Sequence, residues 1–214
     1  MAPVELDSIK QKAKEWFEDL PRLQIARVHS TQYTTTSMSR FFPHTPYAED
    51  QPLPYTILTT HVLTRGLTTG SLLGITLTSI RQLIPSLHRP GPNLPRVLLA
   101  SSTGSILGVG LMALALGGRM YGRDRIEWHD RSWRLLENKG QMEMDDWTYI
   151  GMGLGGVGGA VVSGAAVRSL GRNRAVLGGM GVGGALGMLG EVGWRVGLKG
   201  GKFPEGERGR ERNL

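Results

Sequence analysis

Glycine recurs at intervals of four within long apolar segments, and this pattern constrains the fold more than any other feature of the chain. Residues four apart lie on the same face of a helix, so such a stripe lets another backbone approach closely. The four stripes are Gly66, Gly70 and Gly74; Gly104 and Gly108; Gly151, Gly155, Gly159 and then Ser163; and Gly179, Gly183 and Gly187. We predict that these glycines are contacts between packed helices.

Four apolar segments carry the stripes, and their lengths predict helices that cross a lipid bilayer. They span residues 55–80, 97–116, 147–167 and 175–196. A helix needs about 20 residues to cross a hydrocarbon core about 30 Å thick. The sequence therefore predicts an all-α chain whose residues 55–197 form a membrane domain of four transmembrane helices.

A water-soluble helical bundle is the alternative interpretation, and its difficulty is the glycine content. The chain has 32 glycines in 214 residues. Each one costs a helix in water about 1 kcal/mol relative to alanine. In a bilayer the helix is the obligatory conformation, because lipid cannot hydrogen-bond the backbone. The glycines therefore favour the membrane interpretation.

A formal G-x-G-x-x-G at Gly153, Gly155 and Gly158 raises the question of a dinucleotide site. That site needs a buried strand before the glycines and an acidic residue about 20 positions after them. The preceding EMDDWTYI is not strand-like, and the region from Arg172 to Arg174 holds no acid. We therefore reject the nucleotide interpretation.

Composition argues against most catalytic and binding classes. There is no cysteine, which excludes disulfides, a cysteine nucleophile and thiolate zinc sites. The five histidines have no metal-ligand spacing, and neither a P-loop nor a nucleophile elbow is present. The 25 basic residues are interspersed with 18 acids, unlike a nucleic-acid-binding face. We expect a chain that is not an enzyme and has no cofactor, metal, small-molecule substrate or nucleic-acid partner.

Charge in the short connections predicts the orientation. Residues 81–96 and 168–174 contain arginines but no acid. Basic short loops stay on the cytoplasmic side, or on the matrix side in mitochondria. Both termini and residues 117–146 would then face the opposite compartment. Four interfacial aromatic side chains would share that side: Tyr55, Tyr121, Trp147 and Trp194.

Residues 1–54 and 198–214 are predicted to lie outside the membrane domain. The first stretch begins with an amphipathic helix and continues as an extended arm over residues 20–48. The second is a charged tail. The apolar positions of the helix are Ile9, Ala13, Trp16, Phe17 and Leu20. We expect this helix to dock on protein rather than to anchor the chain on a membrane surface.

Charged residues near the segments have competing interpretations. Arg65 could pair with Glu191 or line a hydrophilic groove, or it could contact a lipid phosphate or a partner's carboxylate. Asp145 and Asp146 are interpreted as acids at a helix N-terminus, where the macrodipole favours them. Four arginines are candidates for contact with a lipid or a partner: Arg65, Arg168, Arg172 and Arg174.

The run from Lys139 to Trp194 resembles the mitochondrial inner-membrane translocase (Tim-type) family. Lys139, Asp145 and Asp146 match the charges that lead into its third span, and Gly151, Gly155 and Gly159 match its glycines. Within that family, residues 55–197 are most similar to the related accessory subunit of the respiratory complex I membrane arm.

The resemblance implies a protein of the mitochondrial inner membrane with four spans and termini in the intermembrane space. It also implies a non-catalytic role, packing against core proton-pumping subunits and binding phospholipid such as cardiolipin. A component of an import translocase and an unrelated small transporter remain alternatives. The second segment has few polar residues, which favours a structural role over a polar channel.

Overall fold

The computed structural model describes residues 41–88, 90–162, 170–198 and 200. Throughout these residues all regular elements are helical, so the predicted all-α class is confirmed for this part of the chain. The predicted N-terminal helix, Ser163, Arg168 and the tail from residue 201 lie outside the described residues.

Four long helices make up the body of the protein. They are α2 (Pro54–Leu83), α3 (Asn93–Met120), α5 (Lys139–Val161) and α7 (Arg172–Gly193). A π-helical turn, η3 (Trp194–Leu198), continues α7. Among the described residues, two helical stretches are long and apolar enough to cross a membrane, namely α3 and Arg172–Leu198.

Local sequence explains where three of these helices begin. Pro54 opens α2 and Pro95 lies in the first turn of α3, where the missing N–H of proline leaves no intrahelical hydrogen bond unmade. Gly171 precedes α7 with a φ of +87°, a left-handed conformation that glycine adopts without steric cost.

The connection over residues 117–146 contains a helix that sequence analysis did not predict, α4 (Arg125–Glu137). Its Leu136 is buried with Ile57 and Met142. Its Trp133 indole N–H donates to the Thr45 carbonyl at 2.8 Å, close to the short 3-10 helix η1 (Ala48–Asp50). The missed signal was the spacing of Trp128, Leu135 and Leu136, which stand at positions i, i+7 and i+8 and so share one helix face.

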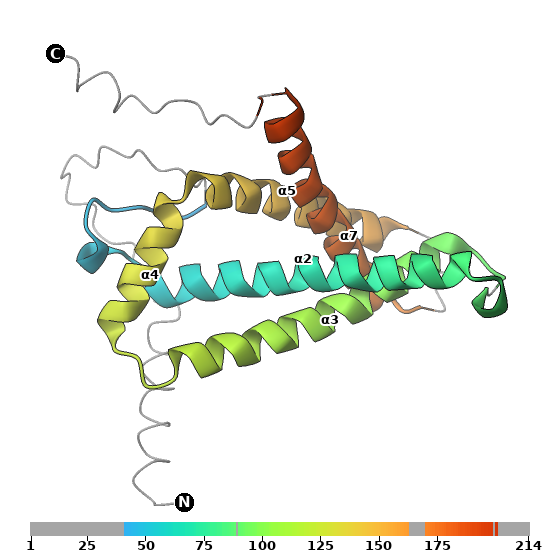
Figure 1. Ribbon diagram of the computed structural model, residues 1–214, viewed down its shortest axis with the longest axis horizontal. Helices are drawn as coiled ribbons and strands as arrows, with labels where there is room; N and C mark the ends of the chain where they lie inside the picture. The colour runs from blue at the N-terminus through green and yellow to red at the C-terminus, as the bar shows by residue number, and fades with distance from the viewer. Residues whose placement is uncertain (1–40, 89, 163–169, 199, 201–214) are drawn as a thin grey trace, which may run out of the picture.

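The long helices associate in two antiparallel pairs (Figure 1). Helix α2 lies along α3, and α5 lies along α7. Helix α7 also contacts α3 and α2, and thereby joins the pairs. The start of α2 and the end of α3 lie beside α4, whereas the short η2 (Pro85–Leu87) connects these two helices at the far end.

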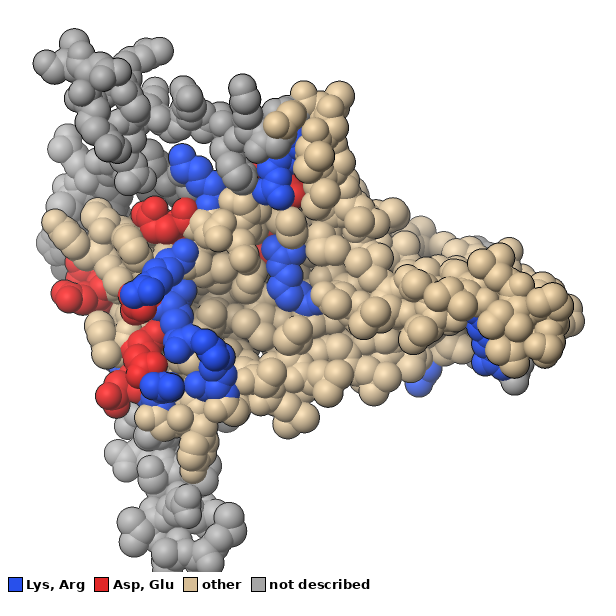
Figure 2. All heavy atoms as spheres, in the orientation of Figure 1, with Lys and Arg blue, Asp and Glu red and all other residues tan. Residues whose placement is uncertain are grey.

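Burial is inverted relative to a water-soluble bundle. The large polar or apolar residues that are buried are few among those described, and the side chains with no exposed area are small and polar: Thr68, Ser71, Ser101, Ser102, Ser105, Ser132 and Thr148. Large apolar side chains point outward from all four long helices and are 63–76% exposed: Leu77, Leu107, Leu111, Leu114, Leu154, Val157, Val161 and Leu186. On the face shown in Figure 2, charged side chains gather towards α4, and the far end of α2 and α3 shows only basic ones.

Candidate functional site

The first glycine stripe lies in the seam between α2 and α3. A Cβ added to Gly66 would lie 2.7 Å from the Gly108 carbonyl oxygen. A Cβ on Gly70 would overlap the Gly104 carbonyl, and one on Gly74 would overlap that of Ala100. These separations are shorter than van der Waals contact, so the two backbones lie in close contact over about two helical turns.

The third and fourth stripes form a similar seam between α5 and α7. Added Cβ atoms would overlap carbonyl oxygens of the facing helix at Gly151 with Gly183, Gly155 with Gly179, Gly159 with Ala175 and Gly187 with Trp147. Every glycine singled out from sequence as a packing residue thus lies in one of two backbone seams.

The formal G-x-G-x-x-G has no loop geometry. Gly153, Gly155 and Gly158 all lie inside α5, whose preceding element is α4 rather than a strand. An added Cβ would meet nothing within 4 Å at Gly153 or Gly158, whereas Gly155 lies in the seam. A helix interior offers no free backbone N–H groups to a phosphate.

Helix α7 has a second contact face that sequence analysis missed, made by Gly178, Gly181 and Gly184. A Cβ on Gly178 would overlap the Leu98 carbonyl of α3. A Cβ on Gly184 would lie 3.0 Å from Thr68 Cγ2 of α2. These glycines are three apart and adjoin the fourth stripe, so a search at four-residue spacing does not separate them. They allow one helix to contact three others.

Three serines connect this face to the α2–α3 pair. Ser101 Oγ donates to the Gly178 carbonyl at 2.8 Å and lies 2.8 Å from Ser71 Oγ, which can donate to it. Ser105 Oγ donates to the Leu67 carbonyl at 3.1 Å. Buried hydroxyls without partners are costly, and these hydrogen bonds satisfy them while joining α2, α3 and α7.

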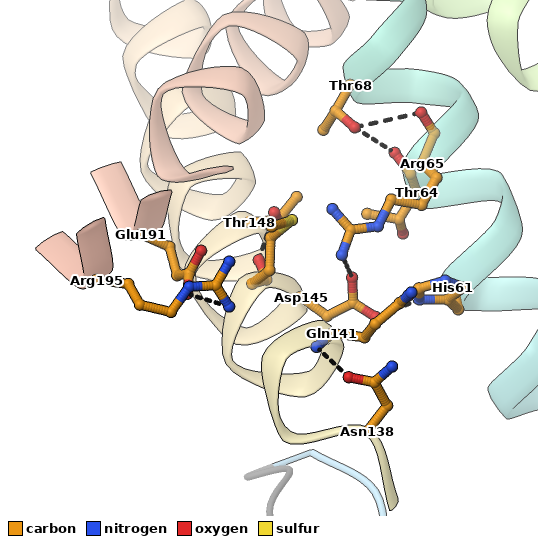
Figure 3. A network of polar contacts seen from close by, with 11 residues as sticks. His61, Thr64, Arg65, Thr68, Asn138, Gln141, Asp145, Thr148, Glu191 and Arg195 are labelled. Atoms are coloured by element: carbon orange, nitrogen blue, oxygen red, sulfur yellow. Dashed lines mark hydrogen bonds and ion pairs between the residues drawn. The ribbon is translucent and has the colours of Figure 1, made fainter. Parts of the chain in front are cut away.

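A buried charge cluster lies where α2 meets the first turns of α5 (Figure 3). The Asp145 carboxylate is 3% exposed and contacts both the His61 ring and the Arg65 guanidinium. The Arg65 Nη2 to Asp145 Oδ1 distance is 2.7 Å. Nearby, Arg195 Nη1 lies 3.3 Å from Glu191 Oε1. Arg65 is therefore paired with Asp145 rather than with Glu191. Glu191 is paired with Arg195, one helical turn further along the chain.

The interpretation of Asp145 and Asp146 as acids at a helix N-terminus was wrong. Helix α5 begins at Lys139, and the Asn138 side chain caps it by accepting from the Gln141 N–H at 3.2 Å. This cap extends the helix beyond the apolar segment, so both acids lie in its second turn and are buried. Asp145 instead neutralises the charge of Arg65 on α2.

A pocket of about 590 Å³ adjoins this cluster and is lined by residues of α2, α5 and η3, among them His61, Arg65, Gln141 and Arg195. Its two arginines already contact carboxylates. Across the part of the chain that the structure describes, no three acidic or histidine side chains converge as metal ligands. This arrangement can hold helices together and present polar groups.

The remaining predicted arginines have a different placement. Arg172 and Arg174 are exposed in the first turn of α7, away from the cluster that contains Arg65.

Comparison with known proteins does not assign a family. No family model matches the chain, and no curated protein or solved structure matches it.

Proposed function

We propose that this chain is a non-catalytic accessory subunit of the membrane arm of mitochondrial respiratory complex I. The inverted burial supports the membrane part of this proposal: the fully buried side chains are mainly serine and threonine, glycines line the helix contacts, and most of the highly exposed side chains of the long helices are leucine and valine. Lipid supplies no hydrophobic drive between helices, so membrane bundles join through small residues and buried hydrogen bonds. The assignment to complex I comes from the resemblance of residues 55–197.

We infer that all four long helices cross the membrane. Helix α3 and the stretch Arg172–Leu198 are apolar enough to cross by themselves. Helices α2 and α5 would cross with them, because the seams hold each one against an apolar partner and bury its polar side chains. By length alone each of the four exceeds the ~20 residues of a span, although the apolar part of α5 begins only at Trp147.

A structural role fits the chemistry of the site better than a catalytic one. The buried charges are compensated within the chain, and the seams make a rigid unit. The outward leucines would pack against neighbouring membrane subunits and phospholipid such as cardiolipin, as the resemblance to the complex I accessory subunit implies. No nucleotide, metal or small-molecule substrate enters this role.

A component of an import translocase is the second candidate, and the polar pocket beside His61, Arg65 and Arg195 favours it. A polypeptide channel needs a polar path along the helices. This pocket lies at one end of the bundle, and α3 contributes none of its lining residues.

Co-migration of the native protein distinguishes these roles. Mitochondrial membranes solubilised in mild detergent should release the chain in a complex that contains NADH dehydrogenase activity, when resolved by blue-native electrophoresis and mass spectrometry. Co-migration with translocase components and without complex I subunits would replace the first proposal by the second.

The acid-free arginine loops predict that both termini face the intermembrane space. Protease added to mitoplasts should remove epitope tags at both ends while leaving residues 81–96 intact. After the inner membrane is dissolved in denaturing detergent, the protease should also cut within residues 81–96. Protection of both tags in mitoplasts would reject the orientation.

A further inference from the structure

An apolar groove of about 860 Å³ follows the α2–α3 seam, and its lining on α2 begins after the charge-cluster residues His61 and Arg65. Its floor is the glycine seam, including Gly70, Gly74 and Gly104. Leucines of both helices form its walls: Leu73, Leu77, Leu99, Leu107 and Leu111. Because glycine has no side chain, the flanking leucines stand above a smooth backbone surface.

One end of this groove is basic. Arg81 from the last turn of α2 and Arg96 from the first turn of α3 line it, together with Gln82. None of the described residues that line the groove is acidic. The far end of α2 and α3 shows the same charge on the surface in Figure 2. The positive charges of Arg81 and Arg96 therefore favour an anionic group at this end of the groove.

The groove is long enough to hold an acyl chain of one leaflet of a bilayer. Its lining runs on α2 from Gly70 to Gln82 and on α3 from Pro95 to Leu111. At ~1.5 Å per residue these stretches are about 18 and 24 Å long, and the part from Gly70 to Arg81 covers about half of a hydrocarbon core of ~30 Å. The arginines thus lie at the depth of lipid phosphates when Gly70 lies near the midplane.

We propose that this groove binds an anionic phospholipid of the inward-facing leaflet, with an acyl chain along the glycine floor and the phosphate on Arg81 and Arg96. Guanidinium groups form charge-assisted, two-point hydrogen bonds with phosphate oxygens, and basic pockets between membrane helices select anionic headgroups. The site rests on the membrane insertion proposed above, and it uses arginines other than Arg65, Arg172 and Arg174.

Lipid titration of the full chain in detergent micelles, followed by native mass spectrometry, tests the assignment. Dioleoylphosphatidylglycerol should bind at least tenfold more tightly than dioleoylphosphatidylcholine, and Arg81→Gln/Arg96→Gln should abolish the difference. The matched pair Arg123→Gln/Arg134→Gln removes two exposed arginines near α4 and should leave the preference intact. Equal effects of both pairs, or equal binding of the two lipids, would overturn the site.

Two further measurements test whether the acyl chain contributes to binding and whether the occupant of the groove is a lipid or a protein. Glycerol 3-phosphate, which has no acyl chain, should not compete with phosphatidylglycerol; competition at equal concentration would overturn the acyl-chain assignment. A photoreactive phenylalanine analogue at Thr103, an exposed residue of the groove wall, should give lipid adducts in native membranes. A polypeptide adduct would show that a partner helix occupies the groove.

Membrane insertion is tested separately by alkaline carbonate extraction. The wild-type chain should stay in the pellet. Release of the wild type would reject the proposed membrane role, whereas a retained chain without lipid preference would reject the groove alone.

Discussion

Gly155→Leu should separate α5 from α7 and yield little or no folded protein. The Cβ atom alone would overlap the Gly179 carbonyl oxygen and lie 2.9 Å from Gly183 Cα, and these are backbone atoms that no rotamer change can move. Overpacking a core usually costs about 1–3 kcal/mol, and we expect a larger loss here because two helices must move apart. The measurement is the thermal midpoint and the monodisperse yield in detergent, followed by size-exclusion chromatography.

Gly153→Leu provides the matched control, because it adds the same side chain to the same helix. Gly153 is exposed, and an added Cβ meets nothing within 4 Å. This variant should therefore resemble the wild type, and Gly183→Leu, on the facing stripe, should resemble Gly155→Leu. Leu154→Ala removes an outward-facing side chain and should be mild. Equal losses for Gly153→Leu and Gly155→Leu would show that the seam does not determine packing.

Asp145→Asn should lower the free energy of unfolding by about 3–5 kcal/mol, the usual cost of removing one partner of a buried ion pair. The variant keeps the shape of the side chain but leaves the Arg65 charge without its carboxylate in a site where the Arg65 side chain is 18% exposed. Unfolding of the full chain in micelles, followed by tryptophan fluorescence, measures the loss.

Two comparisons test whether charge is the cause. Asp130→Asn removes a carboxylate from the exposed Arg134 pair on α4 and should cost at most ~1 kcal/mol. Arg65→Met/Asp145→Leu removes both buried charges and should recover part of the stability lost in Asp145→Asn, since no uncompensated charge remains. If Asp145→Asn and Asp130→Asn cost the same, the buried pair would have no special role.

The charge cluster shows why the polar site was harder to predict than the helices. Arg65 was recognised as a charge inside an apolar segment, but its partner is 80 residues away on α5. Glu191 was the obvious partner because it is the acid inside the last segment, yet Arg195 one turn later contacts it. The choice depends on how each helix is rotated about its axis, and apolar periodicity does not determine that rotation to within one side chain.

The same distinction applies to the smaller elements. Helix α4 and the early start of α5 were missed because length and hydropathy were the search criteria, whereas α4 is short and charged on one face. Its position depends on Leu136 packing with Ile57 and on the Trp133 hydrogen bond to Thr45. Both are contacts between segments far apart in the chain.

The sequence by itself determined that the described residues are helical. It also determined which glycines share a helix face, because residues four apart lie on one face and this period is a local property of the helix. Only the tertiary structure decided which stripe meets which, that α7 uses a second face at Gly178, Gly181 and Gly184, and that Asp145 neutralises Arg65. Those choices depend on the relative register and rotation of whole helices, which are settled by contacts among all four at once.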